Sequence, residues 1–302
     1  MRLYEGLLAA KDDAWFARFS HGGEKQAAAE AMEQQILSPS FFRGYVLVLN
    51  DAVWKLLTNV PEKPVPLMRG QFRSAEILHN MNLGCMKTDH TFELYEGVRD
   101  ALAQVDTDDF QKERHQVSWV HDCLRLIPGL YGYLEEADFV RLCAVSPRWH
   151  GDAAALADMV LKNYRTGVRK EDGGYRSLDK DEPVFRKLLD TIHEQLPVSI
   201  PSYKACMDLI VYGYPTDSDA YRKLAGKLIR AGLADQRNVE QVLAYVHLML
   251  QNGNRYEDFQ KGELYIISPR VMSDCWLDTR GFLFNGAVPH LDRSVFIGKT
   301  EE

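Results

Sequence analysis

The sequence contains no long hydrophobic run. The longest, around residues 45–49, ends at Asn50 and Asp51 and is far shorter than the ~18 apolar residues of a membrane-spanning helix. The N-terminal stretch MRLYEGLLAAKDD is interrupted by Glu5 and closes on two aspartates, so we expect no secretory signal. These absences predict a cytoplasmic protein with no membrane partner.

Basic residues are also too few to give the chain a positive charge. Lysine and arginine number 36 against 43 aspartates and glutamates, and the formal net charge is −7. Non-specific nucleic-acid binding usually needs a basic surface. The charge balance therefore argues against direct nucleic-acid binding and permits a basic partner.

Paired cysteines are missing as well. The five cysteines are odd in number and widely scattered, and no C-x-x-C pair occurs among Cys85, Cys123, Cys143, Cys206 and Cys275. A disulfide framework or a zinc knuckle would cluster them. We expect reduced, mostly buried thiols, as is usual inside the cell.

Catalytic and phosphate-binding motifs are absent: there is no G-x-S-x-G, no P-loop and no G-x-G-x-x-G. His115 and Asp122 share a helix face, with His79 and His90 on neighbouring segments, but His115 and His121 are six residues apart. Metal-binding histidines on one helix are normally four apart. We expect surface or hydrogen-bonded core residues there, and predict no bound metal.

A cysteine nucleophile is the other catalytic candidate. Cys275 has His290 downstream, but the sequence has no local cysteine-protease signature, so we expect a buried thiol. The aspartates at 106, 108 and 109 precede a helix, where acids cap its N-terminus. The sequence therefore predicts neither catalytic residues nor a cofactor.

Helical periodicity dominates what is present, and strand alternation is scarce. The helices recur at roughly 20-residue intervals, as in helical-repeat folds, without an exact repeat. We expect helices over residues 25–37, 38–59, 74–83, 91–105, 109–127, 135–145, 152–164, 184–196, 203–212, 219–231 and 238–250. This succession predicts an all-α fold, an irregular antiparallel helical array.

The chain divides by composition into four parts. Residues 1–166 form an N-terminal helical domain, and residues 167–183, which are charged and glycine-containing, form an exposed loop or a linker. Residues 184–267 form a C-terminal helical region. Residues 268–302 form an irregular tail, in which residues 281–286 are the one place where we allow a short strand pair.

Charge is patterned on two of the expected helices. Asp89, Glu93, Glu96 and Asp100 follow i, i+4, i+7 and i+11, which predicts an acidic stripe opposite an apolar face. Such a stripe is either an ordinary solvated face or a surface that steers a basic partner. A basic counterpart lies on helix 219–231, at Arg222, Lys223, Lys227 and Arg230.

Residues 74–164 resemble a known family in the spacing of three runs: AEILHNMNLGCMKTDHTFELYEGVRDALAQV, SWVHDCLRLIPGLYGYLEEADFVRLCAV and AALADMVLKNY. They look like the helical immunity proteins that neutralise PoNe-type nuclease toxins in bacteria. The resemblance implies no catalytic residues. It implies a cytoplasmic antitoxin whose acidic face covers a basic toxin.

Two classes of function follow. The first is a non-catalytic protein-binding protein that contacts a basic macromolecule through Asp89, Glu93, Glu96 and Asp100, as an immunity protein would. The second is an all-α enzyme whose site is assembled from dispersed residues. A convergent polar pocket would distinguish the enzyme, because catalysis needs one.

Overall fold

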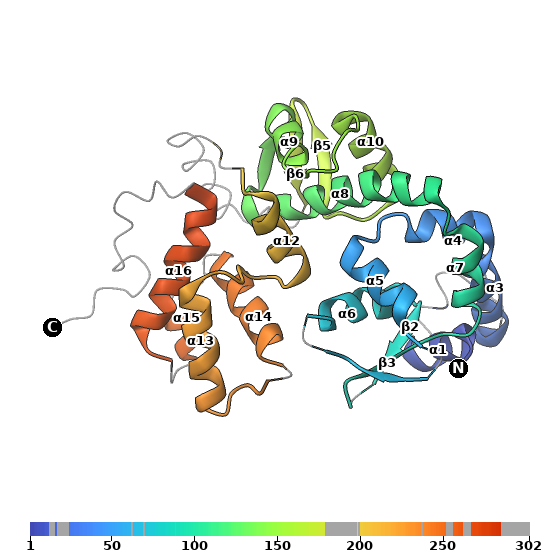
Figure 1. The fold of residues 1–302 in the computed structure, drawn as a ribbon, viewed down its shortest axis with the longest axis horizontal. Coiled ribbons are helices and arrows are strands. Elements are labelled where there is room, and N and C mark those ends of the chain that lie inside the picture. The colour runs from blue at the N-terminus through green and yellow to red at the C-terminus, as the bar shows by residue number, and fades with distance from the viewer. Residues whose placement is uncertain are drawn as a thin grey trace. The chain divides into compact units, whose positions relative to one another are not determined.

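The computed structural model describes residues 1–11, 16, 24–61, 63–68, 70–87, 89–178, 198, 200–236, 238–251, 256–261 and 267–284. The chain splits into two compact units, Met1–Ser118 and Trp119–Glu302. Helices hold 63% of the described residues (Figure 1). None of the described helices is long and apolar enough to cross a membrane.

The helical majority is as predicted, but the all-α fold class is wrong. Two three-stranded antiparallel sheets lie in the middle of the chain, with strand orders β1-β3-β2 and β4-β6-β5. One belongs to each compact unit. Both are built from short strands that interrupt the succession of helices.

The first unit contains six complete helices among its described residues and the start of a seventh. These are α1 (Leu3–Ala10), α3 (Lys25–Leu37), α4 (Pro39–Val46), α5 (Asp51–Asn59), α6 (Phe72–Asn80), α7 (Val98–Val105) and the first part of α8 (Asp108–Leu130). The helix expected over 38–59 is two helices. The Asn50 side chain accepts hydrogen bonds from the amides of Ala52 and Val53, both at 3.1 Å, and so starts α5 anew.

The sheet of the first unit replaces half of a predicted helix. Strands β1 (Val65–Pro66), β2 (Gly84–Met86) and β3 (Thr91–Leu94) form it, with β3 in the centre. The helix expected over 91–105 begins only at Val98. His90 closes the β2–β3 turn at φ 63°, and Asn82 ends α6 at φ 54°; both are left-handed positions that glycine adopts more easily.

The sheet of the second unit lies where we expected a charged loop or linker. Strands β5 (Val168–Glu171) and β6 (Gly174–Ser177) form a hairpin over Asp172 and Gly173, and β4 (Tyr133–Glu135) pairs with β6. Gly174 is required there, since a Cβ atom would lie 2.4 Å from the carbonyl oxygen of Leu134. Residues 179–183 lie outside the described residues.

The helices of the second unit match the prediction within a few residues, with two exceptions. They are α9 (Glu136–Cys143), α10 (Ala153–Asn163), α12 (Tyr203–Val211), α13 (Asp219–Arg230), α14 (Val239–Gln251), α15 (Tyr256–Gln260) and α16 (Pro269–Phe284). One exception is α15, where no helix was expected. The other is α16, because the expected irregular tail is helical as far as residue 284. That helix also occupies most of the strand pair allowed at 281–286, and residues 285–302 lie outside the described part, as does the helix expected over 184–196.

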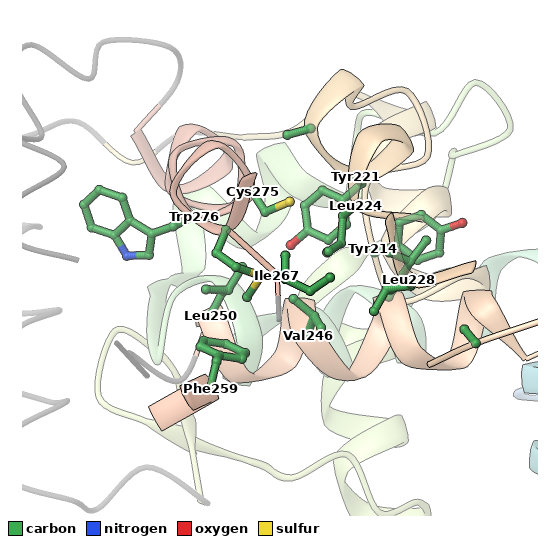
Figure 2. Close-up of a cluster of buried hydrophobic side chains, with 14 of the residues drawn as sticks. Tyr214, Tyr221, Leu224, Leu228, Val246, Leu250, Phe259, Ile267, Cys275 and Trp276 are labelled. Carbon is green, nitrogen blue, oxygen red and sulfur yellow. The ribbon is translucent and has the colours of Figure 1, made fainter. Parts of the chain in front are cut away.

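The predicted helical faces are correctly phased. The helical spacing of apolar residues in the sequence also predicts which side chains form the core. Of these, Leu156 and Met249 are half-buried, and the others are buried: Leu49, Val53, Leu56, Val98, Leu102, Val120, Leu124, Leu142, Leu209, Leu228 and Leu243. In the second unit the apolar faces of α13, α14 and α16 meet in one cluster, which Figure 2 shows from Tyr221 and Leu228 to Cys275. Apolar spacing alone was enough to place these side chains.

Candidate functional site

The four predicted partner-binding residues do not form a stripe on one helix. Asp89 lies in the β2–β3 turn, Glu93 in β3, Glu96 in the segment after β3, and Asp100 in the first turn of α7. Side chains three or four residues apart share a face in a helix, but they alternate between the two faces of a strand. Across a turn, a strand and a helix start, the i, i+4 spacing therefore does not place these four carboxylates on one face. The single-helix stripe is wrong, whereas binding through these residues stays a prediction.

Two of these carboxylates have local structural partners. Asp89 accepts hydrogen bonds from the hydroxyl and amide of Thr91, at 2.6 and 3.0 Å, and the hydroxyl contact is the main reason that the pKa of Asp89 is lowered. Glu93 is only 16% exposed and pairs with Lys87 at 3.2 Å. Asp89 thus shapes its own turn, and Glu93 is largely neutralised.

The remaining two belong to a longer acidic segment around α7. Five carboxylates of this segment are exposed: Glu96, Asp100, Asp106, Asp108 and Asp109. Arg99, the basic residue within it, turns its guanidinium to the carbonyl of Val60. Since α7 is only about 12 Å long, these charges are gathered on a small part of the first unit.

His115 pairs with Asp51, which lies at the start of α5. The contact joins His115 Nδ1 and Asp51 Oδ1 at 3.1 Å. The neighbouring Arg114 is 2% exposed and donates to Asp51 Oδ1 and to the carbonyl of Leu49, both at 2.6 Å. Its guanidinium also lies over the ring of Trp54. This arrangement fastens α8 to the start of α5, which is a structural role.

His121, on the next turn of the same helix, is buried and neutral. Burial, followed by the nearby Arg125, lowers the pKa of His121 to about 3. A general base works best with a pKa near the operating pH. Within the described residues, no three histidine, cysteine, aspartate or glutamate side chains are grouped so as to hold a metal ion.

The second unit contains the polar cluster that most resembles a catalytic arrangement. The Tyr221 hydroxyl lies 2.8 Å from His247 Nδ1 and 2.8 Å from the Thr279 hydroxyl, which itself lies 3.2 Å from His247 Nδ1. These side chains come from α13, α14 and α16, and Figure 2 shows Tyr221 facing Cys275 from α16. Sequence reasoning missed this cluster, because its members are 26 to 58 residues apart.

The donor and acceptor of each hydrogen bond in this cluster follow from the bond that Thr279 makes. The Thr279 hydroxyl donates to the carbonyl oxygen of Cys275 at 2.8 Å, so its own oxygen is left to accept from Tyr221. The Tyr221 oxygen then accepts from His247, which requires the proton on Nδ1. The result is a one-way chain, His247 to Tyr221 to Thr279 to Cys275.

The cluster is closed to solvent. Tyr221 is 0% exposed, Thr279 1% and His247 2%. A substrate therefore does not reach these groups in this state of the second unit. We conclude that the chain of hydrogen bonds joins three core helices and does not form an accessible active site.

The cysteines are unreactive in the same way. All five thiols are free, four are buried and Cys85 is half-buried, which confirms the expectation of reduced, mostly buried thiols. Burial raises the pKa of Cys206 to about 12, and burial likewise raises the pKa of Cys275 and of Cys123. Since the thiolate is the nucleophile, these side chains are in their inert form.

The comparisons with known proteins found nothing similar to this chain. No family model matches the sequence, and neither a curated protein nor a solved structure matches it. The resemblance to immunity proteins over residues 74–164 therefore stays a prediction.

Proposed function

We propose that this chain is a non-catalytic protein-binding protein that contacts a basic partner through the acidic segment around α7. The observation that carries the proposal is the exposure of five carboxylates within 14 consecutive residues, from Glu96 to Asp109. A charged surface of this kind attracts an oppositely charged protein and speeds its encounter. Glu93 is left out of the docking surface because it is only 16% exposed, and Asp89 because it holds its own turn together. Glu96 and Asp109 lie 3.7 Å from the N-terminal ammonium and 3.3 Å from Lys112 Nζ, but both carboxylates remain exposed.

The state of the reactive side chains supports binding over catalysis. His121 is neutral and buried, the Tyr221–His247–Thr279 chain is sealed in the core, and the buried thiols have raised pKa values. Among the residues that the structure describes, none of these particular groups therefore faces a substrate.

The finer proposal is an immunity-type role. A partner with a basic, nucleic-acid-binding surface would be covered by the acidic segment and kept from its own target. Such a partner has the opposite charge to a chain with net charge −7, which favours association at low salt. In this role the chain would be a cytoplasmic protein of a bacterium.

The test is capture of partners from an extract of the native cell at low salt, followed by mass spectrometry and surface plasmon resonance with the captured protein. We expect the wild-type chain to retain a basic protein. Reversing Glu96 and Asp100 to lysine should slow its association about tenfold, because exposed charges act mainly on the rate of encounter.

Glu76→Lys is the matched control. Glu76 is an exposed carboxylate on α6, and α6 packs against α5 and β2. This variant should associate nearly as fast as the wild type. Equal association rates for all three proteins, or a captured partner that is acidic, would end the proposal.

A further inference from the structure

The exposed face of α13 carries a row of cations on the second unit. Lys223, Lys227 and Arg230 are exposed and follow i, i+4 and i+7, so they share one side of the helix with axial steps of about 6 and 4.5 Å. Within the part of the chain that the structure describes, no carboxylate lies within ion-pair distance of these three side chains. Arg222 differs, because it pairs with Asp219 one turn earlier.

The helix that presents this row is firmly held. Tyr221, Leu224 and Leu228 on its opposite face are fully buried. At its start the Ser218 hydroxyl accepts from the amide of Tyr221 at 3.1 Å and also donates to Asp278 of α16. A charged row on a fixed helix loses little conformational freedom when it binds, apart from that of the side chains themselves.

Gly226 is half-buried at the edge of this face, between Lys223 and Arg230 along the helix, and no close contact requires glycine there. A Cβ atom there would contact only the guanidinium of Arg230, at 3.7 to 3.9 Å, which is ordinary van der Waals distance. Glycine inside a helix costs about 1 kcal/mol relative to alanine. The absence of a side chain leaves part of the backbone uncovered between Lys223 and Arg230.

We propose that this cationic face of α13, made of Lys223, Gly226, Lys227 and Arg230, binds an acidic segment of another polypeptide, whose chain approaches closely over Gly226. This is a second surface, on the other unit from the acidic segment around α7 and for a partner of opposite charge, so it does not depend on the proposed function.

Charge and size favour a short acidic segment over a nucleic acid. The row offers three exposed cations that form no ion pair within the described part of a chain with net charge −7, so a long polyanion would meet repulsion beyond the row. Carboxylates four and three residues apart on a partner helix have the same axial steps as the row. Complementary charges at matched spacing give specificity.

The experiment is fluorescence anisotropy with a dye-labelled synthetic peptide that carries glutamates at i, i+4 and i+7, titrated with the full-length chain at about 50 and about 200 mM salt. We expect binding at the lower salt that weakens at the higher. The double variant Lys223→Glu/Lys227→Glu should bind about tenfold more weakly. Asp219→Asn/Arg222→Gln is the control on the same helix: it removes the neighbouring ion pair without changing the net charge or the row, and it should bind as the wild type does.

Gly226→Ala tests whether the partner chain approaches the helix closely at Gly226 or is held by charge attraction alone. It keeps every charge and should raise helix stability, yet it should weaken peptide binding several-fold if the partner chain lies against Gly226. Circular dichroism melts of each variant check that α13 remains folded. Equal peptide binding by wild type and double variant, unchanged binding by Gly226→Ala, or tighter binding of single-stranded DNA than of the peptide would each overturn the proposal as stated.

Discussion

Replacing Tyr221 by phenylalanine and Thr279 by valine should destabilise the second unit unequally, with the threonine the more costly. The two changes remove one hydroxyl each from the chain that runs from His247 to Cys275. Both replacements keep the shape of the side chain. The difference in unfolding free energy therefore reports hydrogen bonding and not packing.

The magnitudes follow from what each change leaves behind. Without the Tyr221 hydroxyl, the Nδ1 proton of His247 still reaches the Thr279 oxygen at 3.2 Å, so the loss is one hydrogen bond, about 1 kcal/mol. Without the Thr279 hydroxyl, the proton of Tyr221 has lost its acceptor inside a sealed core. An unsatisfied buried donor adds its desolvation penalty, which brings the loss to about 2 kcal/mol.

The assay is thermal and urea unfolding followed by circular dichroism, with amide hydrogen exchange in α13, α14 and α16 to localise the effect. A unit of this size should lose about 2–4 °C of Tm per kcal/mol. If His247 carried its proton on Nε2, Tyr221 would donate to Nδ1 and the order of the two losses would be reversed. A Tyr221→Phe variant less stable than Thr279→Val would therefore refute the assigned direction.

Two other predictions concern stability. The pKa of His121 is about 3 in the folded chain against 6.5 when unfolded, so the contribution of neutral His121 to the unfolding free energy is complete above pH 6.5. That contribution is lost by about 1.4 kcal/mol per pH unit as the pH falls towards 3. His121→Gln should flatten this slope in urea unfolding measured across pH. Asn82→Gly should stabilise the first unit by about 0.5 kcal/mol and Gly232→Ala should destabilise the second by about 1 kcal/mol, since both positions have positive φ, and Tm shifts of the opposite signs would contradict this.

The helices were predictable because their apolar faces repeat strongly. In α13, Tyr221, Leu224 and Leu228 mark the buried side, Ser218 caps the start and Gly232 ends the helix at φ 71°. Helix propensity, apolar spacing and capping residues all indicate the same helix there, and such agreement is what allows a segment to be predicted from its sequence.

The strands were not predicted, for two different physical reasons. Leu94 of β3 lies four residues before Val98 of α7, so helical spacing continues across a strand, a turn and a helix start, and one-dimensional periodicity does not separate these elements. The β5–β6 hairpin did carry a signal, the Asp172-Gly173 pair, which is typical of a two-residue turn. Its strands are rich in charge, and that composition favoured the interpretation as a loop.

The candidate sites also differ in how far the sequence predicted them, according to whether one helix or several elements form them. The cationic side of α13 could be predicted from the sequence because it lies within one regular helix. The acidic stripe was misplaced because it crossed from a turn and a strand into a helix. The Tyr221–His247–Thr279 chain depends on three helices packing together, which no local pattern encodes.

The pairing of β4 with β6 has a consequence for the order in which the second unit assembles. The β5–β6 hairpin closes over two residues, whereas joining β4 to β6 closes a loop of roughly 40 residues that contains α9 and α10. Closing a loop of that length costs about 3 kcal/mol of chain entropy, which nothing repays until the two ends meet. We therefore expect the hairpin to form first, and β4 to join β6 after α9 and α10 have shortened the path between the two strands.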